Sequence, residues 1–371
     1  MIPLSVVCCA VAFALSVVVT PLVRRLCTRF GVFDAPGPLK IHQRQTPRLG
    51  GIAIALALTG GCCVARSFFR GSSPLFFAAL ALVWATGLID DLRGLSPSVR
   101  LAAQAVAGLS LWGAGWHCTL PGNGVWNLAA TCLVVMVFVN AMNFLDGADG
   151  LASGVSATIA LTFAATFARN ASAQLSDVVA WSLFGATAGF TLYNFAPASI
   201  FMGDSGSTVV GFSVAALALQ QSGTATANSL KFIALAAALP LFDAALAFIR
   251  RSRSRASPLN GDRRHFYDLM LRRGWPARKV ALVSYAITAL LAVIAWFALR
   301  LGRMGLAFLG VTVFGVLLSM AVRLGSLRGE EQPQVAADHN EADRTGIRSA
   351  TALPAGGGRD TADAADLITW D

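Results

Sequence analysis

Eleven apolar runs, each about long enough to cross a lipid bilayer, follow one another along this 371-residue chain. A transmembrane helix needs roughly 20 mostly apolar residues. Only 13% of the residues are charged, whereas soluble domains carry about a quarter. These features exclude a soluble multidomain enzyme and predict an all-α, polytopic membrane protein. The runs lie near residues 2–23, 49–66, 73–90, 99–117, 125–143, 151–168, 176–194, 204–221, 229–249, 279–299 and 304–322.

Lysine and arginine residues predict how the chain is oriented in the membrane. With the N-terminus outside, the inner segments carry 20 basic side chains and the outer segments carry six. Cytoplasmic loops are enriched in these residues, so we expect the N-terminus outside and the C-terminus in the cytoplasm. The first run lacks the basic leader and the small-residue cleavage site of a secretory signal, which predicts an uncleaved first helix.

The net charge of +10 largely reflects this topology. Residues 330–371 hold nine acids and three arginines, so residues 1–329 hold 26 basic and ten acidic side chains. Because the basic excess sets the orientation in the membrane, no nucleic-acid partner is needed to explain it. We expect residues 1–328 to form a transmembrane domain and residues 329–371 to form a disordered, acidic cytoplasmic tail.

Acidic residues gather on one side of the predicted membrane. Nine of the ten acids before the tail fall on or near the cytoplasmic face, and only Asp177 falls outside. Carboxylates near a bilayer are costly and tend to mark function, so we expect a cation among them. A secondary transporter is the alternative, but it predicts ionisable residues near the midplane of both halves. A structural scaffold would not need several polar motifs on one side.

Two adjacent acids, Asp90 and Asp91, end the third run in the sequence GLIDDLRGLSP. Neighbouring positions on a helix differ by about 100°, so both cannot face one ligand. We expect one carboxylate to bind and the other to orient it. The alternative is a solvated helix end whose acids offset Arg93.

The fifth run ends in NAMNFLDGADG, where Asn140, Asn143, Asp146 and Asp149 recur at every third position. Amides and carboxylates of this kind can hold a hydrated Mg²⁺ ion together with a diphosphate. An ordinary polar turn of Asn, Asp and Gly is the alternative. We favour the metal and diphosphate site because four such residues at one spacing lie next to a spanning segment.

A second acidic motif, FMGDSGS, opens the eighth run with Asp204. The backbone N–H groups and the dipole of a helix N-terminus favour anions. Asp204 could therefore cap the helix, ligate a metal, or do both. Phe201, three residues earlier, offers an aromatic face on the same surface, although a packing role is the simpler alternative.

Basic residues in two inner segments suit phosphate oxygens. The loop between the ninth and tenth runs carries Arg263, Arg264 and His265, and the segment before the second run carries Lys40. Arginines that only set the topology are the alternative. Within the ninth run, we expect Pro240 to kink the helix and Asp243 either to pair with a basic side chain or to line a cavity.

Read in order, the motifs K-x-H with PRLGG, DD, NAxNxxDGxDGL, FMGDxGS and RRH resemble those of the polyprenyl-phosphate N-acetylhexosamine-1-phosphate transferases, glycosyltransferase family 4. Such enzymes use Mg²⁺, for which Mn²⁺ could substitute, to transfer a sugar 1-phosphate from a UDP-sugar to a membrane lipid phosphate, releasing UMP. The resemblance implies a bacterial inner-membrane enzyme whose active site, in residues 1–328, faces the cytoplasm. Its implied partners are a UDP-N-acetylhexosamine, undecaprenyl or another polyprenyl phosphate, and the bilayer, with a homodimer left open.

The resemblance also implies roles for individual residues. Asp204 is the expected magnesium ligand, with Asn143 near the metal and the diphosphate. Asp90 is expected to bind or deprotonate the lipid phosphate. The remaining catalytic candidates are Asp91, Asp146 and His265. The remaining substrate-binding candidates are Phe201, which would stack on the uracil, Asp149, which would hydrogen-bond the uracil edge, and Asn140, Lys40, Arg263 and Arg264.

One departure from the family pattern bears on the donor sugar. Family members commonly carry a histidine-rich run in the last inner loop, but here His265 is followed by Phe266, Tyr267 and Asp268. This departure, and PRLGG in place of a PTMGG-like sequence, argues against the phospho-N-acetylmuramoyl-pentapeptide transferase branch, which stays the alternative within the family. We expect an N-acetylglucosamine-type or modified N-acetylhexosamine donor that feeds O-antigen, capsule or another cell-envelope glycan.

Overall fold

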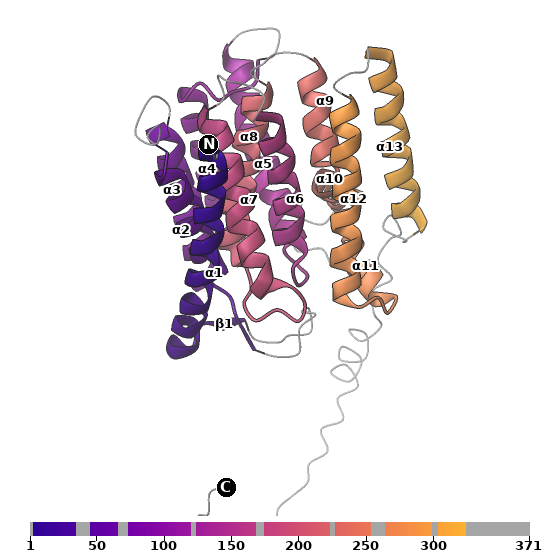
Figure 1. The fold of residues 1–371 in the computed structure, drawn as a ribbon. Coiled ribbons are helices and arrows are strands. Elements are labelled where there is room, and N and C mark those ends of the chain that lie inside the picture. Colours follow the sequence, from indigo (N-terminus) through magenta and orange to yellow (C-terminus); the bar gives the residue numbers. More distant parts are fainter. Residues whose placement is uncertain are drawn as a thin grey trace, which may run out of the picture. The chain divides into compact units, whose positions relative to one another are not determined.

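The computed structural model describes residues 3–34, 45–65, 73–119, 124–167, 174–222, 227–253, 264–298 and 303–323. These residues are helical apart from loops and one two-residue antiparallel pair of strands, β1 (Phe33–Asp34) and β2 (Thr46–Pro47). The helices form the bundle in Figure 1: α1 (Leu4–Phe30), α2 (Gly50–Cys63), α3 (Ser73–Arg93), α4 (Pro97–Gly113), α5 (Gly124–Leu145), α6 (Leu151–Phe167), α7 (Gln174–Asn194), α8 (Gly203–Ser222), α9 (Ala227–Ala236), α10 (Ala238–Arg253), α11 (Phe266–Arg272), α12 (Ala277–Ala298) and α13 (Arg303–Arg323).

The predicted apolar runs coincide closely with these helices. In the described part of the chain, α1, α3, α5, α7 and α12 are long and apolar enough to cross a membrane. The structure therefore supports a multi-pass, helical membrane protein. The count of eleven crossings and the orientation of the two termini stay predictions.

The ninth predicted run forms two helices, α9 and α10, which meet at Ala237. Pro240 has no backbone N–H, so it cannot donate to the carbonyl of Ala236 four residues earlier. The break at Ala237 follows from this missing hydrogen bond, and it agrees with the kink predicted just before Pro240.

Helix α8 lies at the centre of the bundle, against α2, α3 and α5 among others. Every residue from Ser205 to Leu219 is buried, as expected for a helix without a polar face. A small residue lets α5 come close: a Cβ atom added at Gly211 would lie 2.6 Å from the Cα atom of Val139. This close contact fixes α8 against α5, whose C-terminal end carries the polar motif.

The short helix α11 lies in a segment that we expected to be a loop. The helix begins with a capping box, in which the side chains of His265 and Asp268 each accept the backbone N–H of the other residue. Gly274, with φ of 82°, follows the end of the helix. The chain divides into the units Met1–Arg328 and Gly329–Asp371, and all described elements lie in the first. The predicted disordered tail lies outside the described residues.

The packing of α8 predicts that Gly211→Ala destabilises the protein. The added methyl group would press on the backbone of Val139, and such overpacking typically costs about 1–3 kcal/mol. Gly310→Ala is the matched control, because a Cβ atom there meets nothing within 4 Å. Thermal unfolding in detergent should show a lower midpoint for Gly211→Ala alone. A Gly211→Ala midpoint at or above that of the unchanged protein would contradict this packing.

Candidate active site

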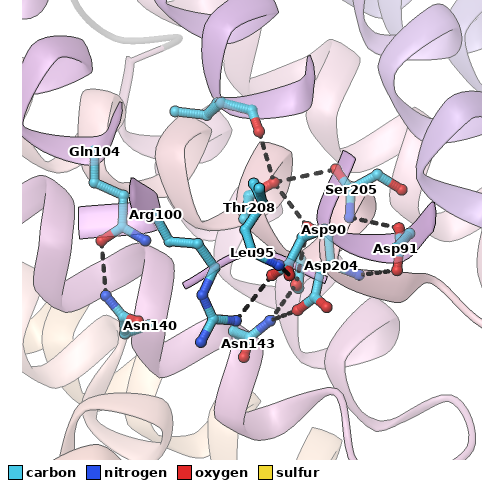
Figure 2. A network of polar contacts seen from close by, with 12 residues as sticks. Asp90, Asp91, Leu95, Arg100, Gln104, Asn140, Asn143, Asp204, Ser205 and Thr208 are labelled. Carbon is cyan, nitrogen blue, oxygen red and sulfur yellow. Dashed lines mark hydrogen bonds and ion pairs between the residues drawn. The ribbon is translucent and has the colours of Figure 1, made fainter. Parts of the chain in front are cut away.

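The polar motifs meet where the ends of α3 and α5 approach the start of α8. Asp91 near the end of α3 accepts hydrogen bonds from α8, and Asn143 near the end of α5 donates one to Asp204 in the first turn of α8. The structure thus brings Asp90, Asp91, Asn143 and Asp204 together at one end of the bundle, although they lie far apart in the sequence (Figure 2).

The segment that contains PRLGG is bound to the loop before α8 through its backbone. Phe201 N–H donates to the carbonyl of Pro47 over 2.8 Å, and Gly50 N–H donates to the carbonyl of Phe201 over 3.0 Å. Gly51 N–H likewise donates to the carbonyl of Met202 over 2.8 Å. A Cβ atom at Gly51 would overlap the backbone of α8, so this position requires glycine. PRLGG is therefore a packing motif in the described part of the structure.

Asp91 contacts the N-terminus of α8 directly. Its Oδ1 accepts the backbone N–H of Asp204 at 3.0 Å, and its Oδ2 accepts that of Ser205 at 2.9 Å. Arg48 Nη2 lies 3.2 Å from the same Oδ1 atom. The side chain of Asp91 is only 1% exposed, so both oxygens are occupied within the protein.

Asp90 turns away from Asp91 toward α4. Its Oδ1 accepts the backbone N–H of Leu95 at 2.7 Å, and its Oδ2 pairs with Arg100 Nη1 at 2.9 Å. The two adjacent carboxylates therefore face different partners, as their helical spacing predicts. Each one is paired with a different arginine.

Asp204 projects toward α5. Asn143 Nδ2 donates to Asp204 Oδ1 and to the hydroxyl of Ser207, the latter over 3.0 Å. Thr208 Oγ1 donates to the backbone carbonyl of Asp204 at 2.7 Å. These contacts fix the side chain of Asp204, which lines a small cavity, and in the described structure its Oδ2 atom receives no hydrogen bond.

That cavity lies between α3, α4, α5 and α8. Its inner wall carries an amide pair, in which Asn140 Nδ2 donates to Gln104 Oε1 at 2.8 Å. Asn140, predicted to bind substrate, therefore faces the same space as Asp204. The polar residues that line the cavity are Thr86, Asp90, Arg100, Gln104, Asn140, Asn143, Asp204 and Thr208.

Asp146, in the loop after α5, belongs to the same acidic group. Removal from water raises the pKa of Asp146 well above its usual range, and the carboxylates of Asp204 and Asp91 raise it further. A hydrogen bond from the backbone N–H of Gly203 acts in the opposite direction. Burial is thus the main reason that the charged form of Asp146 is disfavoured, and the neighbouring carboxylates add to it.

In the described structure, two of the four carboxylates pair with arginines, and the other two do not. Asp90 pairs with Arg100 and Asp91 pairs with Arg48, but no lysine or arginine among the described residues forms an ion pair with Asp146 or Asp204. A cation fits beside these two carboxylates. In the described part of the chain, no three His, Cys, Asp or Glu side chains form a closed metal site. Mg²⁺ does not need one, because it usually takes one or two carboxylates and keeps water and phosphate ligands.

Asp149 and Phe201 lie next to the loop between α7 and α8. Asp149 Oδ2 accepts the backbone N–H of Ala198 at 2.9 Å, so one carboxylate oxygen holds this loop in place. Asn194 Nδ2 holds the same loop by donating to the carbonyl of Ile200. Phe201 follows the loop and is partly exposed.

His265 is far more buried than the prediction of a substrate contact suggests, with 3% of the residue exposed. Its Nδ1 atom lies 2.5 Å from Asp243 Oδ2, and Phe266 N–H donates to Asp243 Oδ1 at 3.0 Å. Of the two alternatives for Asp243, the structure shows a pairing with a basic side chain. This pair joins α10 to the start of α11.

Aromatic rings place His265 beside the motif at the end of α5. The ring of His265 stacks on Tyr267 at 5.5 Å and contacts Phe144 at 5.4 Å. Tyr267 OH donates to the carbonyl of Phe144 at 3.0 Å, and a side chain at Gly147 would overlap that hydroxyl. His265 is therefore fixed next to the loop that carries Asp146.

Several predicted phosphate contacts are placed less fully. Lys40 and Arg263 lie outside the described residues, so their roles stay predictions. Arg264 is described next to His265 and is partly exposed.

The sequence reading missed two residues of the cavity, Arg100 and Gln104. In the sequence, Arg100 contributes only to the predicted orientation, although it lies ten residues after Asp90, beyond a short turn. Gln104 follows one helical turn later on the same face of α4. A glutamine inside an otherwise apolar run is a signal that could have identified this face.

Comparisons with known proteins match the same part of the chain. The model of the family described as Glycosyl transferase family 4 matches residues 73–222, which contain the DD, NAMNFLDGADG and FMGDSGS motifs. The decaprenyl-phosphate N-acetylglucosaminephosphotransferase of Mycolicibacterium smegmatis is 30% identical over 74% of this chain and 77% of its own. This chain belongs to glycosyl transferase family 4.

Other family 4 relatives are more distant but cover similar shares. The probable undecaprenyl-phosphate N-acetylglucosaminyl 1-phosphate transferase of Bacillus subtilis is 26% identical over 75% of this chain and 81% of its own. The undecaprenyl-phosphate alpha-N-acetylglucosaminyl 1-phosphate transferase of Escherichia coli K12 is 26% identical over 72% of this chain and 77% of its own. The family predicted from the motifs is confirmed.

The buried pair of this family 4 protein predicts that Asp243→Ala is strongly destabilising. It leaves the His265 ring nitrogen and the Phe266 N–H without their acceptor, at a cost of about 3 kcal/mol. In a His265→Ala background the same change should cost less, because one of the two donors is already absent. Equal losses of unfolding free energy in both backgrounds would show that the pair does not couple α10 to α11.

Proposed function

We propose that this protein transfers N-acetylhexosamine 1-phosphate from a UDP-sugar to a polyprenyl phosphate and releases UMP. The observation that carries the proposal is that Asp204, which lines the cavity, and Asp146 form no ion pair with a lysine or arginine among the described residues. Family membership supports the same reaction, because the relatives are named as polyprenyl-phosphate N-acetylglucosamine-phosphate transferases. The donor that these names favour is UDP-N-acetylglucosamine.

The metal is proposed to be Mg²⁺, held by Asp204 with Asn143 and Asp146 beside it. When bound, Mg²⁺ would neutralise diphosphate charge and favour the departure of UMP. The chain's own part is to hold these side chains in place: Asn143 fixes one oxygen of Asp204, and the backbone N–H of Gly203 bonds Asp146. Positioning and charge neutralisation are what phosphoryl transfer chiefly needs.

The lipid phosphate is proposed to arrive beside Asp90 and Arg100. Both groups line the cavity next to Asp204, and at present they neutralise one another. An incoming phosphate would compete with Asp90 for the guanidinium of Arg100, since arginine bonds phosphate and carboxylate in the same way. Asp90 would then be free to accept the phosphate proton.

The nucleotide is proposed to bind beside Phe201 and Asp149. Phe201 would stack on the uracil, and the Asp149 oxygen that does not hold the loop would accept a hydrogen bond from its edge. His265 lies behind the loop that carries Asp146, fixed by Asp243 and two aromatic rings. Arg264, and the predicted contacts Arg263 and Lys40, would bind the diphosphate.

The reaction is proposed to be a direct displacement. An oxygen of the lipid phosphate attacks the phosphorus that carries the sugar, and the bond from that phosphorus to the bridging oxygen breaks. The bridging oxygen leaves with UMP. No covalent enzyme intermediate is needed, because holding both anions in line replaces a bimolecular encounter.

The setting is proposed to be the cytoplasmic face of a bacterial inner membrane. The product would feed an envelope glycan such as O-antigen or capsule. The buried side chains do not favour the transporter alternative, since the four carboxylates lie at the ends of helices rather than along them. The N-acetylglucosamine names of the relatives favour this branch over the muramoyl-pentapeptide one.

The proposed metal predicts that Asp204→Ala abolishes transfer. Purified protein, undecaprenyl phosphate, Mg²⁺ and UDP-N-acetylglucosamine should release UMP, and Asp204→Ala should lower the rate at least about a hundredfold. Asp177→Asn, on the acid predicted to lie outside, is the control and should keep the rate. Chelation of Mg²⁺ should reproduce the loss. An Asp204→Ala variant with full transfer would remove the metal assignment.

Stacking on uracil predicts a selective effect of Phe201→Ala. Loss of one aromatic stacking contact is worth about 1–3 kcal/mol, so the KM for the UDP-sugar should rise about tenfold or more. Phe201→Trp, which keeps an aromatic face, should restore most of the affinity. Steady-state kinetics and competition by free UDP would measure both effects. Unchanged affinity in Phe201→Ala would exclude the stacking role.

A further inference from the structure

We propose that Asp91 is a positioning residue, which caps helix α8 from the neighbouring helix α3 and thereby sets the place of Asp204. This inference rests on the proposed function for its effect on transfer, but its structural part does not. It gives a specific form to the expectation that one acid of the DD pair binds and the other orients, and it replaces the catalytic role that the family resemblance implies for Asp91.

Most of the acceptor sites of the Asp91 carboxylate are already occupied within the protein. It accepts two backbone N–H groups, those of Asp204 and Ser205, and it pairs with Arg48. A carboxylate has about four lone-pair sites, so three of them are in use. With 1% of its side chain exposed, Asp91 presents no surface to a substrate.

The backbone N–H groups of Asp204 and Ser205, which donate to Asp91, have no acceptor within α8 itself. The first four N–H groups of any helix lack an intrahelical acceptor, and a side chain of the same chain segment usually caps them. Here the cap comes from α3, more than 100 residues away in the sequence. Its negative charge also suits the positive end of the α8 dipole.

Glycines in α3 and at the start of α8 make room for this contact. A Cβ atom at Gly87, one turn before Asp91, would lie 2.6 Å from the carbonyl of Asp204. Gly203 has φ of 72°, and a Cβ atom there would lie 2.7 Å from Asp91 Oδ2. Both glycines therefore allow the carboxylate to reach the backbone of α8.

Arg48 completes the arrangement from the segment that follows β2. It pairs with Asp91 at 3.2 Å and with Asp34 at 3.6 Å. The guanidinium compensates the charge of Asp91, which would otherwise repel Asp204 nearby. Asp91 thus accepts hydrogen bonds from the start of α8 while Arg48 pairs with its charge.

The consequence is a fixed direction for the Asp204 side chain. With its backbone N–H bonded to Asp91 and its carbonyl bonded to Thr208, Asp204 meets Asn143 in the lining of the cavity. Small displacements of a metal-binding group weaken a site strongly. Loss of the cap should therefore weaken metal use, while leaving the reacting groups themselves in place.

Hydrogen exchange in metal-free protein tests the structural part. Backbone exchange at Asp204 and Ser205, followed by mass spectrometry in detergent, should speed up about tenfold in Asp91→Ala, as expected for a lost hydrogen bond to a charged acceptor. Asp91→Asn keeps one acceptor oxygen and should fall between the two. Gly203→Ala disturbs the same contact from the other side and should also accelerate exchange.

Transfer kinetics test the functional part. The Mg²⁺ concentration for half-maximal rate should rise about tenfold in Asp91→Asn, with most of kcat recovered at saturating Mg²⁺. Asp34→Asn, which removes the other partner of Arg48, is the matched control and should leave both readouts unchanged. A wild-type protein without transfer would contradict the proposed function, but the exchange result would still decide the cap.

Two results would overturn the inference. Unchanged exchange at Asp204 and Ser205 in Asp91→Ala would show that Asp91 does not cap α8. Loss of transfer in Asp91→Asn at every Mg²⁺ concentration, as complete as in Asp204→Ala, would show that Asp91 touches the reacting groups instead.

Discussion

The site depends on how a helix bundle accommodates four carboxylates at one apolar end. Like charges in a poorly hydrated setting repel strongly, and isolated carboxylates there are costly. Arg100 and Arg48 pair with Asp90 and Asp91, whereas Asp146 and Asp204 form no such pair among the described residues, and the charge of Asp204 acts on Asp146. The proposed Mg²⁺ would reduce that repulsion. This imbalance of charge is the physical reason for proposing a metal and a diphosphate at the site.

Close backbone contacts make this arrangement possible. Glycines at positions 51, 87, 203 and 211 let α2, α3 and α5 approach the buried helix α8, in the way small residues allow helices to pack in membranes. The polar groups at the ends of these helices are then carried to fixed positions. The packing of these helices on α8 therefore determines where the charged groups at their ends lie.

Much of the fold could be predicted from the sequence because spanning helices leave a strong apolar signal. The break near Pro240 was predictable from proline chemistry, and the divergence of Asp90 and Asp91 from helical spacing. Their partners were not predictable, because Arg48 and Arg100 meet them only through tertiary packing. Helix α11 and the burial of His265 were also missed. Both depend on Asp243 and Tyr267, whose contacts no local pattern reveals.

Electron paramagnetic resonance of Mn²⁺, used in place of Mg²⁺, tests the central claim most directly. Purified protein with UDP-N-acetylglucosamine should bind one Mn²⁺ ion whose spectrum carries phosphorus couplings from the diphosphate. Asp204→Asn should remove the bound signal, whereas Asp177→Asn should keep it. A bound Mn²⁺ signal that is unchanged in Asp204→Asn would contradict the view that Asp204, at the start of α8, forms the metal site.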